Sequence, residues 1–300
     1  MRVKYDNHPQ QWAEILSDPK QLEHSLTWFA DDRVDSWRHR RMRELVLPVI
    51  AGSKDKKWLT VGDGRYGTDA HYLLAQGVKD VHASDIVDTM LKIGAEKNFI
   101  SSFSAQNAED LTFGDEEFDY VYCKESYHHF PRPYMAVYEM LRVCREAVIL
   151  TEPNDILSPL TLTSSIAKTA SRWLKTLTGK KIQHHAFEEA GNYVYTVSDW
   201  EIKKLMLGLG LRYCAFKGLN DHYIAGAEQA LFSGGTPADR QIKKKIMRMI
   251  AREDFLCGIG LKKYALITAI IFKKKPDGTI WKDLQAAGFT CEVLPQNPYH

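Results

Sequence analysis

The sequence has no long hydrophobic run, no closely spaced cysteines and no marked excess of charge of either sign. Its longest apolar stretch runs from Ala265 to Phe272 and is interrupted by one Thr, whereas a membrane-spanning helix needs about 20 apolar residues. The N-terminal residues MRVKYDNHPQQW contain no apolar segment of the kind found in secretory signals. We therefore expect neither a transmembrane segment nor a signal peptide.

The five cysteines include no C-x-x-C pair, and the two nearest in sequence are Cys123 and Cys144. Zinc sites and redox-active dithiols usually place two cysteines a few residues apart, so the sequence predicts neither. Free thiols are typical of reducing compartments. We therefore expect a cytoplasmic protein with reduced cysteines.

The charges almost cancel, because 40 Lys and Arg stand against 38 Asp and Glu, for a formal net charge of +2. Proteins that bind nucleic acid or anionic membranes through their overall field carry a clear positive excess, so we expect neither partner. A basic stripe within residues 243–252 is interpreted as the solvated face of an amphipathic helix. The 44% hydrophobic and 26% charged residues are typical of a globular protein; they do not indicate an oligomeric state.

Two regions of the chain differ in pattern. Residues 1–50 set aromatic and aliphatic side chains among Arg and Asp, which predicts an N-terminal helical cap. In residues 51–300 short apolar runs alternate with amphipathic stretches, the pattern of βαβ units. We predict strands at 58–61, 81–84, 100–104, 118–123, 147–153, 211–216 and 265–275, and insertions at about 154–197 and 220–258. The predicted fold class is α/β, with a mostly parallel seven-stranded sheet and helices on both faces.

A glycine-rich loop follows the first predicted strand, where Gly62, Gly64 and Gly67 fit the pattern G-x-G-x-x-G and Asp63 lies between the first two. Glycines in such a loop allow a tight turn and direct the amides of the next helix at a ligand. Asp85, followed by Ile86, ends the second predicted strand, where a carboxylate can accept both hydroxyls of a ribose. The alternatives are a simple tight turn and a helix cap. Together the two motifs favour a nucleoside-containing cofactor.

Residues 57–153 resemble the class I S-adenosylmethionine-dependent methyltransferases, whose fold is Rossmann-like. The resemblance rests on residues in chain order: the strand Phe118-Asp119-Tyr120-Val121, the loop Glu125-Ser126-Tyr127-His128-His129-Phe130, and Glu152-Pro153-Asn154. It implies S-adenosylmethionine as the cofactor and S-adenosylhomocysteine as the product. It further implies that Ala108 and Glu109, with Asn107 beside them, lie next to the adenine, and that Glu125 belongs to the cofactor site.

Two positions depart from the family pattern. Many members carry an acid two residues before the first glycine, where this chain has Thr60, and a third glycine where this chain has Tyr66. Asp63 or Asp69 is the candidate replacement for the missing carboxylate.

Two adjacent histidines, His128 and His129, end the fourth strand region, at the edge where open α/β sheets bind ligands. An imidazole titrates near neutrality, and a base assists methyl transfer when the acceptor is a hydroxyl or another protonated group. One of the two is therefore our candidate catalytic base, and the alternative is that both only shape the loop. We expect no metal, because His184 and His185 come with no predictable further ligands.

We predict a methyltransferase that acts on a small-molecule acceptor, with an oxygen of a sugar or another metabolite receiving the methyl group. Two alternatives stay open. An NAD(P)-dependent oxidoreductase also carries G-x-G-x-x-G followed by an acid, and a non-catalytic protein that binds S-adenosylmethionine would account for Thr60 and Tyr66. The Asn107–Glu109 segment favours the methyltransferase over the oxidoreductase.

Overall fold

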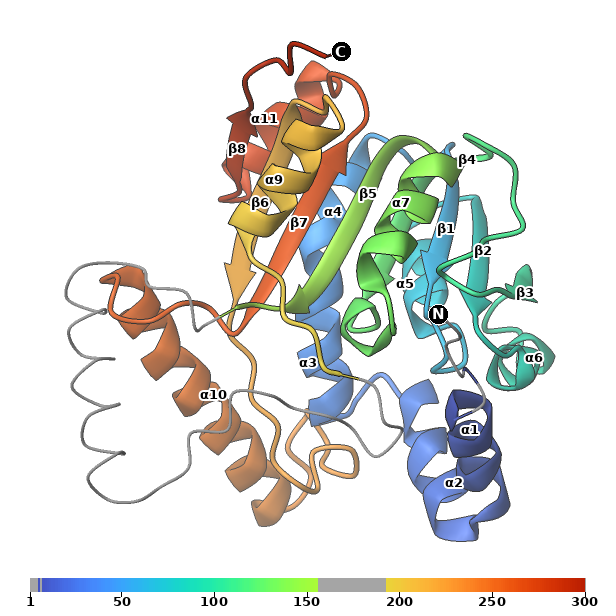
Figure 1. Ribbon diagram of the computed structural model, residues 1–300. Coiled ribbons are helices and arrows are strands. Elements are labelled where there is room, and N and C mark those ends of the chain that lie inside the picture. The colour runs from blue at the N-terminus through green and yellow to red at the C-terminus, as the bar shows by residue number, and fades with distance from the viewer. Residues whose placement is uncertain (1–4, 6, 156–192, 300) are drawn as a thin grey trace, which may run out of the picture.

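The computed structural model describes Tyr5, residues 7–155 and residues 193–299 (Figure 1). Within them a single sheet has the order β3-β2-β1-β4-β5-β7-β6-β8. Neighbours among β1 to β5 pair in parallel, β7 is antiparallel to both β5 and β6, and β8 is antiparallel to β6. The strands are β1 (Lys57–Val61), β2 (Asp80–Asp85), β3 (Phe103–Ala105), β4 (Phe118–Lys124), β5 (Cys144–Pro153), β6 (Tyr213–Leu219), β7 (Leu266–Phe272) and β8 (Thr290–Val293). The predicted α/β class with a mostly parallel sheet is confirmed.

The predicted number of seven strands is wrong, because β8 adds an eighth strand at the edge beside β6. It has only four residues, TCEV, and its side chains are exposed or half-buried. Such a short edge strand leaves little hydrophobic pattern to detect. The third predicted strand also begins later than expected, at Phe103, and the last one ends earlier, at Phe272.

Helices cover both faces of the sheet and create two apolar cores (Figure 1). Successive side chains of β5 point to opposite faces, as in any strand: Val148 and Leu150 join one core, while Ala147 and Ile149 join the other. The first core contains residues of α7 (Pro133–Val143) and α9 (Asp199–Gly208). The second contains residues of α4 (Leu47–Ala51), α5 (Thr68–Ala75), α6 (Thr89–Glu96) and α11 (Gly278–Ala286).

A further layer lies beyond the carboxyl end of β5 (Figure 1). It consists of α1 (Asn7–Ser17), α2 (Pro19–Leu26), the 3₁₀ helix η1 (Thr27–Phe29), α3 (Val34–Arg43) and α10 (Pro237–Gly258). Val34 packs with Ala230, Ile246 and Ile250 in a third, smaller apolar cluster, and its backbone N–H donates to the Ala230 carbonyl at 2.9 Å. The N-terminal helices and the second predicted insertion therefore form one layer over this edge of the sheet.

At the predicted boundary near residue 50, Val49 and Ile50 of α4 are buried in the second core together with residues of the strands. The η2 turn (Glu44–Val46) joins α3 to α4. The first predicted insertion, with His184 and His185, lies largely outside the described residues. No helix in the described part of the chain is long and apolar enough to cross a membrane.

Candidate functional site

The glycine loop connects β1 to α5 and requires glycine at two positions. Gly62 has φ +75°, and a Cβ atom there would lie 2.4 Å from the Cβ atom of Ser126. A Cβ atom at Gly64 would lie 2.8 Å from the Asp85 carboxylate. Real Cβ atoms do not approach other atoms so closely, so a side chain at Gly62 would have to displace Ser126, and one at Gly64 would have to displace the Asp85 and Trp12 side chains. Gly67, with φ +77°, is the N-cap of α5.

Asp63 ties this loop to α5. Its carboxylate accepts hydrogen bonds from the backbone N–H groups of Asp69 and Ala70 at 3.0 and 2.8 Å, and from the Thr60 hydroxyl at 2.9 Å. Burial, together with the nearby charge of Asp69, raises the pKa of Asp63 to about 7. Thr60, where many family members have an acid, is thus a hydrogen-bond partner of the acid three residues later.

Tyr66 stands where the family pattern has a glycine, and it adopts a left-handed conformation with φ +60°. Its side chain is fully buried against Phe29 of η1, with ring centroids 4.4 Å apart. Its hydroxyl lies 2.7 Å from the Ser25 hydroxyl of α2. The departure from glycine therefore joins the loop to the N-terminal helices.

Asp85 ends β2 and is buried beside the loop. The backbone N–H of Val87 donates to its carboxylate at 3.5 Å, and the backbone N–H groups of Ile86 and Gly64 and the indole of Trp12 on α1 also lower its pKa. Burial raises the pKa of Asp85 to about 7 even though these donors lower it. A carboxyl group so placed takes up a proton near neutral pH unless further donors stabilise its charge.

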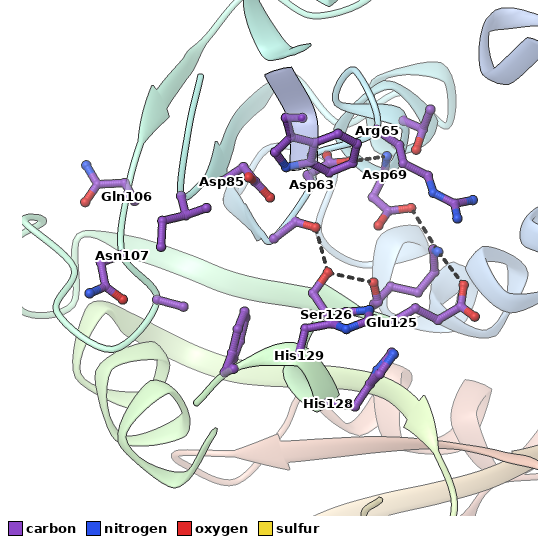
Figure 2. Close-up of a pocket in the computed structure, with 18 of the residues that line it drawn as sticks. Asp63, Arg65, Asp69, Asp85, Gln106, Asn107, Glu125, Ser126, His128 and His129 are labelled. Carbon is purple, nitrogen blue, oxygen red and sulfur yellow. Dashed lines mark hydrogen bonds and ion pairs between the residues drawn. The ribbon is translucent and has the colours of Figure 1, made fainter. Parts of the chain in front are cut away.

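The glycine loop, Asp63 and Asp85 line one pocket with a volume of about 730 Å³. Figure 2 shows Gln106 and Asn107 on one side of it, Asp69 and Glu125 on the other, and Asp85 between them. Every residue that the sequence predicts for the site lines this pocket except Gly67: Gly62, Asp63, Gly64, Asp85, Ile86, Asn107, Ala108, Glu109, Glu125, His128 and His129. Gly67 belongs to the turn into α5 instead.

Glu109 lines the pocket and also makes contacts within the protein. Its carboxylate accepts hydrogen bonds from the backbone N–H and the Nε of Arg132, both at 2.6 Å, and from the Tyr5 hydroxyl at 2.7 Å. The Asn107 Oδ1 accepts the Glu109 backbone N–H at 3.0 Å. Glu109 thus connects Arg132, in the loop before α7, and Tyr5, in the N-terminal segment, to the side of the pocket formed by Asn107 and Ala108.

A network of charged side chains forms the opposite wall. Glu125, which has φ +50°, contacts His39 of α3 at 3.0 Å and Lys124 at 3.1 Å. Asp69 contacts Lys124 at 3.7 Å and Arg43 at 2.6 Å. Burial raises the pKa of Glu125, but the positive charges of Lys124 and His39 outweigh it and hold that pKa well below its usual range. Glu125 is therefore ionised at neutral pH.

The two histidines occupy the 3₁₀ turn η3 (Tyr127–His129) directly after β4. The Nδ1 of His128 lies 2.7 Å from the Oε2 of Glu152 on β5. The rings of His128 and His129 lie with centroids 3.9 Å apart.

Sequence comparisons relate the part of the chain that carries this pocket to known methyltransferases. Residues 59–151 match the family described as "Methyltransferase domain". A demethylmenaquinone methyltransferase of Renibacterium salmoninarum is 30% identical over 146 residues, which are 48% of this chain and 58% of that protein.

This chain contains a class I S-adenosylmethionine-dependent methyltransferase domain. The cofactor of this class is S-adenosylmethionine, as its name states. The chain spans 58% of the length of the Renibacterium relative.

Two solved structures are similar to this chain at low sequence identity. The YcgJ protein of Bacillus subtilis has 19% identity and a TM-score of 0.48, and the likeness covers 79% of this chain and 100% of that one. A methyltransferase of Archaeoglobus fulgidus has 15% identity and a TM-score of 0.46, and the likeness covers 78% of this chain and 94% of that one.

Several residues that line the pocket are not predicted by any motif in the sequence. They are mainly those contributed by the N-terminal helices and by positions without a motif: Tyr5, Trp12, Ile15, Trp28, His39, Arg65 and Lys124. Nothing in the local sequence of α1 or α3 signals a pocket, because these contacts join residues far apart in the chain. Among the described residues of the methyltransferase, no group of three or more His, Cys, Asp or Glu could hold a metal ion.

Proposed function

We propose that this protein transfers the methyl group of S-adenosylmethionine to an oxygen of a small-molecule acceptor, a sugar hydroxyl or the hydroxyl of another metabolite. The observation that carries the proposal is that one pocket joins the glycine loop and Asp85 to the histidine pair after β4. The parts that suit a cofactor and the part that suits proton transfer thus face the same space.

The pocket residues fit S-adenosylmethionine. Asp85 lines the pocket, where its carboxylate can accept the ribose hydroxyls. Asn107 and Ala108 would lie beside the adenine, and Glu109 supports them through Arg132. The Glu125 network, with charges of both signs, suits the ammonium and carboxylate of the methionine part. Gly62 and Gly64 bring the backbone close to the bound molecule.

The cofactor, when bound, supplies a methyl group on a sulfonium that is already a good leaving group. The protein must hold the acceptor in line with that methyl and exclude water. We propose that His128 takes the acceptor's proton, since a neutral imidazole can accept a proton and His128 lines the pocket. We propose that His129 belongs to the pocket wall that positions the acceptor.

The acceptor would enter beneath the layer made by the N-terminal helices and α10. This layer lies at the carboxyl edge of the sheet (Figure 1), where open α/β sheets bind ligands. We propose that the insertion at 220–258 shapes the acceptor pocket, and that residues 1–50 act as its cap. We further propose a cytoplasmic enzyme whose partner is a small molecule rather than nucleic acid, in keeping with its five free cysteines.

Label transfer tests this function directly. Purified protein is incubated with methyl-labelled S-adenosylmethionine and a small-molecule extract of cells, and the label in each chromatographic fraction is measured. We expect a labelled product with the wild type and at least a 100-fold slower appearance with His128→Ala, since general base catalysis contributes about 10²- to 10⁴-fold. His129→Ala serves as the matched control and should slow transfer by less than tenfold.

The proposal fails if the wild type binds S-adenosylmethionine but labels nothing in any extract, which would favour the non-catalytic binding protein. The choice of His128 fails if His128→Ala keeps the wild-type rate.

A further inference from the structure

Glu152 is a buried carboxylate that contacts three residues of the segment that carries the histidines, and its Oε1 also accepts the Cys123 thiol of β4 at 3.8 Å. It lies near the carboxyl end of β5 with a fully buried side chain. Its Oε1 accepts the backbone N–H groups of Ser126 and Tyr127, each at 3.0 Å. Its Oε2 lies 2.7 Å from the Nδ1 of His128. One side chain of β5 thus holds three consecutive residues of the loop after β4.

These contacts determine which atoms carry hydrogen. Peptide N–H groups can only donate, so Oε1 must be an acceptor, and hydrogen bonds of this kind favour the ionised form of a carboxyl group. An ionised carboxylate has no hydrogen to donate. The short contact between Oε2 and Nδ1 therefore requires the hydrogen to be on Nδ1, which leaves the lone pair of a neutral imidazole on Nε2.

We infer that Glu152 is a positioning residue that holds His128 with its hydrogen on Nδ1 and its lone pair on Nε2, the atom that accepts the proton of the methyl acceptor. This inference rests on the proposed function for its catalytic meaning. The tautomer itself follows from the contacts of the protein alone.

The backbone around His128 is fixed in the same way. The Ser126 hydroxyl donates to the Gly62 carbonyl at 2.6 Å, which ties the histidine loop to the glycine loop. The backbone N–H of Tyr195 donates to the His128 carbonyl at 3.2 Å. With the loop held at both ends, the contact with Glu152 sets the orientation of the ring.

The resulting step is balanced. The O–H bond of the acceptor breaks and its proton moves to Nε2 of His128. The oxygen's electron pair forms the new C–O bond to the methyl carbon, and the electron pair of the broken C–S bond stays on sulfur in S-adenosylhomocysteine. The imidazolium then carries hydrogen on both nitrogens, and the negative charge of Glu152 beside Nδ1 stabilises it until the proton leaves to solvent.

Nitrogen NMR of the histidine side chains tests the tautomer without any acceptor. Protein labelled with ¹⁵N in histidine is recorded above the pH at which imidazole is protonated, and His128 is assigned by comparison with His128→Gln. We expect a protonated Nδ1 and an unprotonated Nε2 in the wild type. In Glu152→Gln the amide NH₂ can donate to Nδ1, so the hydrogen should move to Nε2. A wild type with hydrogen on Nε2 overturns the inference, even if no variant folds.

The chain offers a matched control. The Nε2 of His222 lies 2.9 Å from the Oε2 of Glu253 on α10, a second Glu–His pair that is not part of the pocket lining. Glu253→Gln should change the signals of His222 and leave those of His128 in place. If it alters His128 as much as Glu152→Gln does, the effect of Glu152 is a general structural one and the inference is wrong.

Cofactor binding and label transfer separate this inference from the proposed function. Glu152→Gln should bind S-adenosylmethionine within twofold of the wild type and transfer label at least 100-fold more slowly, because the wrong nitrogen then carries the lone pair. Unchanged transfer with the hydrogen on Nε2 would refute the positioning role. A wild type without any transfer refutes the proposed function, whereas the tautomer of His128 is still decided by the NMR result.

Discussion

At the scale of single residues, the raised pKa of Asp85 links its protonation to the binding of the cofactor. Asp85 is placed by β2 and the glycine loop, is buried, and has a pKa raised by that burial to about 7. Ribose hydroxyls that donate to it would stabilise its charge and lower that pKa. Binding and deprotonation of Asp85 are therefore linked.

This linkage predicts that the affinity for S-adenosylmethionine rises with pH. Below about pH 7 the free protein must lose the Asp85 proton to bind, so the dissociation constant should fall by up to tenfold for each pH unit from 5 to 7 and then level off. Asp85→Asn should bind more weakly and lose this dependence. Calorimetric titrations between pH 5 and 8 in two buffers of different ionisation enthalpy measure both the affinity and the proton released. An affinity independent of pH would contradict the linkage.

At the scale of elements, the parts with strong local signals were predictable from the sequence and those without were not. The glycine loop lies between β1 and α5, where the sequence predicts it. Two other local signals mark helix starts, the capping box of Ser198 and Glu201 at α9 and Pro133 at α7. These signals act between neighbours in the chain. The sequence does not predict the edge strand β8, because its four exposed or half-buried residues show no clear alternation of apolar and polar side chains.

The left-handed Tyr66 joins an element of the methyltransferase domain to the N-terminal helices, and its two contributions can be separated. Tyr66→Phe removes the hydrogen bond with Ser25 and should cost about 1 kcal/mol of unfolding free energy. Tyr66→Ala also removes the packing against Phe29 and should cost roughly 3 to 5 kcal/mol. Chemical denaturation measures both. Equal effects of the two substitutions would show that the ring packing contributes nothing.

At the scale of the whole molecule, the pocket is completed by segments that are far apart in sequence. Tyr5 reaches Glu109 across 104 positions, and Arg38 of α3 binds Asp221 of the loop before α10. Sequence patterns report local periodicity and spacing, so they placed the glycine loop, Asp85 and the histidines in one pocket but gave no sign of Trp12 or His39. The cap can be inferred from a sequence, whereas its contacts with the pocket cannot.

The cluster between α3 and α10 predicts that both helices loosen together. Ile246 is fully buried between them, and Ile246→Ala should cost roughly 2 to 5 kcal/mol of the stability of this layer. We expect faster hydrogen exchange in both 34–43 and 237–258, with the strands β1, β4 and β5 unchanged. Met247→Ala, at an exposed neighbouring position, is the control. Faster exchange in α10 alone would show that the two helices are not coupled.

The most direct test of the whole account is a calorimetric titration of the protein with S-adenosylmethionine, S-adenosylhomocysteine and NAD, repeated with Asp85→Ala. We expect the two adenosyl compounds to bind with micromolar affinity, NAD not to bind, and the substitution to weaken binding by more than tenfold, about 1.4 kcal/mol. Binding of NAD without binding of either adenosyl compound would contradict the account and establish the dinucleotide as the ligand of this pocket.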